Sequence, residues 1–234
     1  MSSKKVDPKV SFPKMGQRLH ILEASGRLTP LVEEITLAVE RVIGKIGSTL
    51  LLPPVDIVIV DNPEGSIPET GVGGRAYNAH FLVISVDPEF TRIHDVIGEE
   101  IESTLAHELH HCARMDAIGY GETLLEALVT EGLADHFDIE INGGMPKPWS
   151  NALSKGQVED LLKKAAPEYR KRSYSHESWF FGSEEMGIPR WTGYSLGFKI
   201  VSDYLMKTGK KPSELVGIPA SEFVKTQRPS TLNE

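Results

Sequence analysis

Hydrophobic and polar residues follow two different periods in the first half of the chain. Over residues 29–46, apolar side chains recur at helical spacing and Thr29 is a suitable N-cap, so an amphipathic helix is expected. Residues 55–60 are mostly β-branched or apolar, which predicts a buried strand. A glycine-rich turn is expected at residues 71–75, followed by a second strand over residues 76–86.

The second half of the chain is predicted to be mainly helical. Apolar residues at helical spacing predict helices over residues 95–115, 123–139, 154–166 and 193–206. Residues 167–190 have no clear period and are expected to be irregular. A run of strands followed by a run of helices indicates the α+β class.

The domain organisation follows from these elements and from the chain length. Residues 1–16 are rich in Ser, Lys and Pro and are expected to form a loose N-terminal arm. Residues 17–234 are long enough for a single domain with a sizeable core. Within this domain we expect an upper lobe with the sheet over about residues 17–115 and a helical lower lobe over about residues 116–234.

Composition narrows the class of protein. Hydrophobic residues at 40% and charged residues at 25% are ordinary for a soluble globular protein, and a net charge of −8 argues against a nucleic-acid partner. No apolar run is long enough for a membrane span, and Met1–Pro8 lacks the apolar core of a secretory signal. The single cysteine, Cys112, fits a reducing compartment, so a cytoplasmic location is expected. The oligomeric state is left open.

The most informative motif runs from His107 to His111 and reads HELHH. The two outer histidines are four residues apart on a predicted helix and share a face, so both imidazoles can bind one metal ion. Glu108 lies beside that ion, where it can take a proton from a metal-bound water. Cys112 belongs to the apolar stripe of the same helix and is expected to be a buried packing residue.

A third metal ligand is expected on the next helix. Glu131 follows His111 with 19 residues between them, which is enough chain to end the first helix, turn and return antiparallel. Its carboxylate would complete a site with one position open for water. Asp135 lies one turn further on and could accept a hydrogen bond from a metal-binding histidine, which would fix that ring. Gly132 allows another backbone to approach closely.

This arrangement resembles the gluzincin group of metallopeptidases, and its spacing is similar to that of thermolysin. Residues 107–111, 124–135 and the GYSLG sequence at 193–197 also resemble a bacterial family of predicted zinc-dependent proteases. The resemblance implies a zincin-like fold. In that fold a small N-terminal sheet packs on the HExxH helix, and the C-terminal lobe is mainly helical.

The resemblance also implies roles for individual residues. Zn²⁺ would be bound by His107, His111 and Glu131. Glu108 would be the general base, and Asp135 would orient a ligand. The substrate would be a peptide or a protein.

Two further features of the gluzincins have candidates in this chain. An edge strand that pairs with extended substrate could be Tyr77–His80, although the same residues also fit a plain sheet strand. The donor to the oxyanion comes from the C-terminal lobe in gluzincins, and Tyr194 is the first candidate. His176 and Arg190 are second choices, and Tyr194 could instead be a core tyrosine.

These observations predict a zinc-dependent peptide-bond hydrolase in which a glutamate activates a zinc-bound water. Two other functions fit the same motif. One is a catalytically silent zinc-binding regulatory or interaction module, and the other is a hydrolase that attacks an ester or a non-peptide amide. Glu108 argues against the silent module, because a structural zinc site needs no base and prefers four protein ligands.

Overall fold

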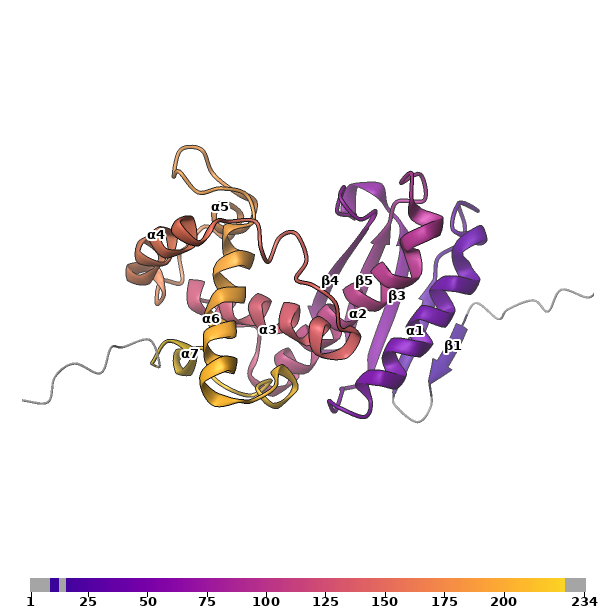
Figure 1. The fold of residues 1–234 in the computed structure, drawn as a ribbon. Helices are drawn as coiled ribbons and strands as arrows, with labels where there is room; N and C mark the ends of the chain where they lie inside the picture. Colours follow the sequence, from indigo (N-terminus) through magenta and orange to yellow (C-terminus); the bar gives the residue numbers. More distant parts are fainter. Residues whose placement is uncertain (1–8, 13–15, 226–234) are drawn as a thin grey trace, which may run out of the picture. The chain divides into compact units, whose positions relative to one another are not determined.

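The computed structural model describes residues 9–12 and 16–225, and the chain divides into two compact units (Figure 1). Unit 1 spans residues 1–116 and unit 2 spans residues 117–234. The boundary falls near the end of the helix that carries the HELHH motif. The expected single catalytic domain over residues 17–234 stays a prediction.

Unit 1 contains a mixed sheet of five strands in the order β1-β2-β3-β5-β4. The central strands β2, β3 and β5 are parallel, while β1 and β4 pair antiparallel at the two edges. The strands are β1 (Lys9–Phe12), β2 (Gln17–Ile21), β3 (Val55–Asp61), β4 (Val72–Asn78) and β5 (Phe81–Val86). Within the described residues, β4 therefore has one edge that no other strand pairs with.

Two helices, α1 (Val32–Ile46) and α2 (Ile93–Ile118), lie along this sheet (Figure 1). Successive side chains of a strand point to opposite faces, and in β3 Val55, Ile57 and Ile59 are at most 2% exposed. The residues between them are partly exposed, so the sheet has one core face and one face that is more open. Short 3₁₀ turns occupy Thr29–Leu31 and Pro63–Gly65.

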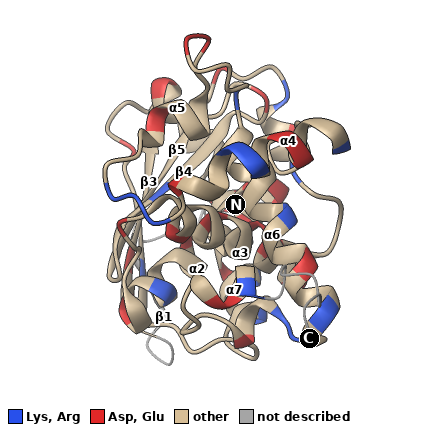
Figure 2. Cartoon of the chain, turned by 90° about the vertical axis from the view of Figure 1, so that its left-hand side faces the viewer, with Lys and Arg blue, Asp and Glu red and all other residues tan. Residues whose placement is uncertain are grey.

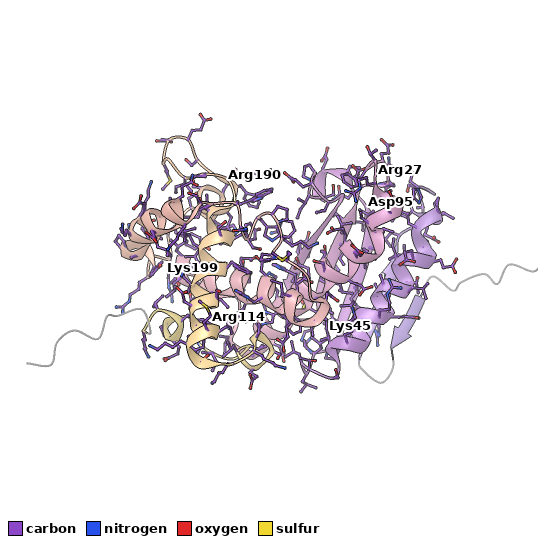
Figure 3. All side chains as sticks on the ribbon, in the orientation of Figure 1. Arg27, Lys45, Asp95, Arg114, Arg190 and Lys199 are labelled. Atoms are coloured by element: carbon purple, nitrogen blue, oxygen red, sulfur yellow. The ribbon has the colours of Figure 1, made fainter. Side chains whose placement is uncertain are left out.

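Helix α2 is tied to α1 by ion pairs around Glu102. Arg41 Nε and Lys45 Nζ each donate to the Glu102 carboxylate at 2.7 Å (Lys45 is labelled in Figure 3). Burial raises the pKa of Glu102, but the hydrogen bonds from Lys45 and Arg41 outweigh this effect and lower the pKa below its ordinary value. The carboxylate is therefore charged at neutral pH, and the pairs tie α2 to α1.

Unit 2 is built from helices. They are α3 (Leu124–Asn142), α4 (Lys155–Ala165), α5 (His176–Phe181), α6 (Thr192–Thr208) and α7 (Ser221–Lys225), with 3₁₀ turns at Ala166–Glu168 and Pro212–Glu214. Thr123 and Ser154 begin α3 and α4 with capping boxes, in which each side chain accepts from a backbone N–H of the first turn. Helix α4 carries both acidic and basic residues (Figure 2), as a partly exposed amphipathic helix should.

The core of unit 2 forms around α3 and α6. Trp179, Phe180 and Phe223 are fully buried in it. The two helix backbones touch at Gly132 and Gly197, where a Cβ built on either residue would overlap backbone atoms of the other helix. The expectation that Gly132 permits a close backbone approach is therefore confirmed.

The structure confirms the α+β class, with the sheet in the first half of the chain and most helices in the second. Each predicted helix is present within a few residues of its expected bounds, and so is the strand expected over residues 55–60. No helix in the described part of the chain combines the length and the apolar character that a membrane span requires.

Two predictions are wrong, one for the N-terminal arm and one for the segment expected to be irregular in the second half. Lys9–Phe12 pairs with β2 as strand β1 and is not part of a loose arm, while residues 1–8 and 13–15 of that arm lie outside the described residues. His176–Phe181, in the segment expected to be irregular, forms α5 with Ser175 as its N-cap. Its apolar residues are too few to reveal a helical period.

The prediction for residues 71–86 also needs correction. The glycines expected to form a turn lie in or beside β4, and the single strand expected over residues 76–86 is interrupted by a turn at Ala79–His80. Pairing with β5 overrides the low strand propensity of glycine. Gly73 has a further reason to lack a side chain, because a Cβ there would overlap the carbonyl oxygen of Gly65.

Replacing Gly197 with alanine is expected to destabilise unit 2 by about 1–3 kcal/mol. The new Cβ would overlap the carbonyl oxygen of Leu128, and this backbone atom cannot move without shifting α3. Chemical denaturation followed by circular dichroism measures the change. The control is Gly156→Ala on α4, where nothing lies within 4 Å of the added Cβ, and stability should be unchanged or slightly higher. Equal stability of the two variants would contradict the role of Gly197.

Candidate metal centre

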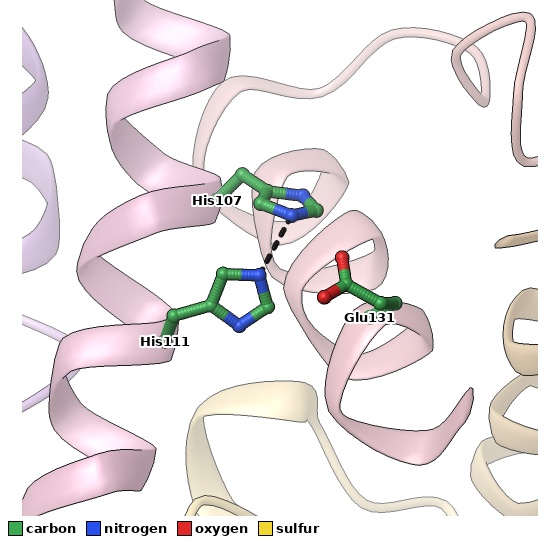
Figure 4. Close-up of side chains that lie close together, drawn as sticks. All are labelled: His107, His111 and Glu131. Carbon is green, nitrogen blue, oxygen red and sulfur yellow. Dashed lines mark hydrogen bonds between the residues drawn. The ribbon is translucent and has the colours of Figure 1, made fainter. Parts of the chain in front are cut away.

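Helix α2 brings His107 and His111 together. They lie one turn apart, and their Nε2 atoms are 2.9 Å from each other, with the rings inclined at 86° (Figure 4). If one ring is protonated at Nε2, this contact is a hydrogen bond. If neither is, the pair presents two nitrogen lone pairs at one place, which is the state in which histidine binds metal ions.

Glu108 is buried on the same helix, with 6% of its surface exposed. The Ala76 backbone N–H on β4 donates to Glu108 Oε2 at 2.7 Å. A carboxylate with a fixed orientation suits a general base, which must meet its proton in one geometry. The sequence pointed to Glu108 but not to Ala76, since no pattern in β4 indicates which of its amides faces α2.

Glu131 is buried on α3, with 7% of its surface exposed. Tyr120 Oη donates to Glu131 Oε1 at 2.5 Å. Burial, followed by the negative charge of Glu131, raises the pKa of Tyr120 well above its ordinary value. The phenol therefore keeps its proton at neutral pH and can hold the carboxylate by one oxygen.

Tyr120 was not among the residues predicted from the sequence. It lies in the connection between α2 and α3, between Gly119 and Gly121, which both have positive φ angles (82° and 99°). Such angles favour glycine and shape a tight connection. An aromatic residue between two glycines, just before a helix with an acidic residue, was the available signal.

Asp135 accepts two hydrogen bonds within unit 2. Trp149 Nε1 donates to Oδ1 at 3.1 Å, and Ser150 Oγ donates to Oδ2 at 2.6 Å. Ser195 on α6 supports the same segment, because its Oγ donates to the Trp149 carbonyl at 2.9 Å. The carboxylate is thus fixed by a loop that the sequence did not single out. Its expected bond to a metal-binding histidine stays a prediction.

The three candidates for the oxyanion donor all lie in unit 2, and two of them, Tyr194 and His176, contact the same ring, Phe180. Tyr194 is half-buried on α6, edge-to-face with Phe180 at 5.1 Å, and close enough to Tyr120 to raise the pKa of that phenol further. His176 is exposed and stacks on Phe180 at 4.3 Å. Arg190 is exposed, and its guanidinium lies 3.9 Å from the ring centroid of a neighbouring tryptophan. The role of Tyr194 stays a prediction.

His107, His111 and Glu131 form a group that could hold a metal ion. Each offers one ligand atom, and these atoms all lie within 4.8 Å of one another (Figure 4). Among the described residues, this is the one group of three or more histidine, cysteine or acidic side chains that meets this condition. Two imidazoles and one carboxylate are a donor set that catalytic zinc uses, and three protein ligands leave a position for water. The residues present therefore fit zinc.

Cys112 lies one residue beyond His111 but belongs to the core. It is fully buried, and burial, with the charge of Glu108 as a smaller cause, raises the pKa of its thiol to about 12. A neutral thiol is a poor metal ligand, so this setting suits the packing role expected from the sequence.

The chain matches a family model described as "Predicted Zn-dependent protease (DUF2268)" over residues 33–225. It is also 28% identical over 151 residues to the uncharacterized protein YjaZ of Bacillus subtilis (strain 168). That alignment covers 62% of this chain and 54% of YjaZ, so this chain spans about half the length of that relative. No solved structure matches the chain significantly.

Replacing Tyr120 with phenylalanine is expected to weaken zinc binding roughly 10–100-fold. The change removes the hydroxyl that holds Glu131 and keeps the ring in place. Competition with a chromogenic zinc chelator measures the affinity. Tyr169→Phe is the matched control in unit 2, because no hydrogen bond to another described residue is present at its hydroxyl, and affinity should be unchanged. Equal affinities of both variants and the parent protein would place Tyr120 outside the metal centre.

Proposed function

Since this chain belongs to a family of predicted Zn-dependent proteases, we propose that it is a zinc-dependent peptide-bond hydrolase of the gluzincin type. The observation that carries this proposal is the close group of His107, His111 and Glu131. Two histidines of one HExxH helix and a glutamate from the following helix are the arrangement that the gluzincin resemblance implies. The family match includes all three residues.

The three side chains would hold the ion, with Tyr120 keeping the Glu131 carboxylate in position. When bound, zinc would supply Lewis acidity, which lowers the pKa of an attacking water towards about 7 and polarises a carbonyl. The imidazoles must be deprotonated at the ligating nitrogens for this, so acidification is expected to release the metal.

Glu108 is the proposed general base. Its carboxylate would take a proton from the attacking water and then deliver it to the leaving amine. Its position directly after His107 and its burial support this role, because a desolvated carboxylate beside the reaction centre interacts strongly with a proton. The bond from the Ala76 amide fixes the orientation of the carboxylate before substrate arrives.

The substrate is proposed to be a peptide or protein segment in extended conformation. Among the strands that the structure describes, none pairs with one edge of β4 (Val72–Asn78), and a segment added there would gain backbone hydrogen bonds. The expected segment Tyr77–His80 overlaps this strand at Tyr77 and Asn78, while Ala79 and His80 lie in the turn after β4. The contact of Ala76 with Glu108 on this edge would bring the paired segment to the base.

The oxyanion needs a second donor besides the metal, and we assign this role to Tyr194. It lies at the start of α6, half-buried and with a phenol that can donate. Asp135 is proposed to orient one of the metal-binding histidines, since its carboxylate is already fixed by Trp149 and Ser150.

The first test of the proposed function is Glu108→Gln. This change keeps the size of the side chain and removes the base, so zinc content should be normal while hydrolysis falls by roughly 10²–10⁴-fold. A quenched fluorescent peptide library measures turnover, and atomic absorption measures the metal. Undiminished turnover at normal zinc content would refute the role of Glu108. Absence of hydrolysis in the zinc-loaded parent protein would favour a silent zinc-binding module.

The second test is Asp135→Asn. If Asp135 orients a ligand histidine, the loss of its charge should weaken zinc binding roughly 10–100-fold in chelator competition. Glu140→Gln on the same helix is the matched control, since Ser213 donates to its carboxylate from the backbone N–H at 2.9 Å and from Oγ at 2.7 Å, and zinc affinity should be unchanged. An affinity that Asp135→Asn leaves unchanged would restrict Asp135 to holding the Trp149–Ser150 loop.

A further inference from the structure

The backbone groups of β4 alternate between two sides, as in any antiparallel strand. The Gly71 carbonyl accepts from the Asp87 N–H at 2.8 Å, so it points to the side of β5. Along the strand, Gly74 and Ala76 then have their N–H and C=O groups on the open edge. The bond from the Ala76 N–H to Glu108 therefore uses an edge amide for which β5 offers no partner. The register of β4 against β5 shifts directly afterwards, between Ala76 and Asn78.

Gly74 lies beside this contact, where a side chain has no room. A Cβ built on Gly74 would lie 2.6 Å from both Cγ and Oε1 of Glu108, and 2.7 Å from Cγ2 of Thr104. The backbone does not require glycine here, because Gly74 is not among the glycines with positive φ. Glycine is needed at this position because any side chain would occupy the space that the Glu108 side chain fills.

We propose that Gly74 and Ala76 are positioning residues for Glu108. Gly74 leaves the space into which the side chain extends, and the Ala76 amide holds Oε2 so that the carboxylate keeps one orientation. Their effect on hydrolysis rests on the proposed function, whereas the contact itself does not. Gly74, Ala76 and Glu108 all belong to unit 1, so the contact is formed entirely between β4 and α2.

A purely structural role for Gly74 makes a different prediction. In that case Gly74→Ala would lower activity because its Cβ pushes β4 away from Thr104. Thr104→Ser, which removes the colliding methyl group, would then restore the activity. If Gly74 acts through Glu108, removing the methyl group of Thr104 leaves the collision with Cγ and Oε1 in place. The two accounts therefore differ in whether Thr104→Ser rescues Gly74→Ala.

The contact is tested first without any catalytic assay, by amide hydrogen exchange of Ala76 in the full chain, followed by NMR. An edge amide exchanges fast unless something accepts its hydrogen bond, so we expect protection in the parent protein. Glu108→Ala and Gly74→Ala should each speed the exchange roughly 10–100-fold. Gly44→Ala on α1, where nothing lies within 4 Å of the added Cβ, should not. Unchanged exchange in Gly74→Ala and Glu108→Ala would overturn the proposal.

Catalytic measurements then test the consequence. The assay uses the zinc-loaded protein and a peptide that the parent cleaves. Gly74→Ala should lower kcat roughly 10²-fold, while KM and zinc affinity stay within about twofold. Adding Thr104→Ser to this variant should not restore kcat. Recovery of kcat in the double variant, or an unchanged kcat, would overturn the positioning role. If the parent protein hydrolyses nothing, the proposed function fails, and the exchange measurement alone still decides whether Gly74 and Ala76 hold Glu108.

Discussion

The proposed metal centre depends on one geometric constraint: residues four apart on an α-helix lie on the same face. In α2 this constraint places the Nε2 atoms of His107 and His111 2.9 Å apart. Two nitrogen lone pairs at that separation repel each other unless the nitrogens share a proton or both bind one cation. The helix thus places two of the three ligands of the proposed metal site through its own backbone, and the remaining features matter because they complete or stabilise that site.

The surroundings of α2 hold that half-site rigid. Arg41 and Lys45 fix the helix through Glu102, which stays charged because their hydrogen bonds lower its pKa. Strand β4 meets the helix at Glu108, through the Ala76 amide. In unit 2, Tyr120 donates a hydrogen bond to the Glu131 carboxylate, and Trp149 and Ser150 donate to the Asp135 carboxylate. Each acidic residue of the proposed centre therefore has a neutral donor that fixes its orientation, which is how preorganised sites avoid rearranging during a reaction.

The sequence was sufficient to point to the candidate residues whose spacing follows a helical period. His107, Glu108 and His111 share one helix, and Glu131 and Asp135 are spaced one turn apart on the next, so local spacing indicated them. The same holds for the long helices and for the strand at residues 55–60.

The sequence was insufficient where a contact depends on strand register or on the path of a loop. Ala76 faces Glu108 only because of how β4 pairs, and Tyr120 reaches Glu131 only because two glycines shape the connection. The turn predicted at the glycines of β4 was wrong for the same reason, since pairing with β5 outweighs the preference of glycine for turns.

The most direct test of the central claim is X-ray absorption at the zinc edge on the zinc-loaded full chain. The account predicts one zinc ion with only nitrogen and oxygen neighbours at roughly 2.0–2.1 Å, including the scattering pattern of two imidazoles. The pattern of two imidazoles should disappear when His111 is replaced. A sulfur neighbour at about 2.3 Å would mean that Cys112 binds the ion, and a spectrum without imidazole would mean that the histidine pair does not; either result contradicts the account.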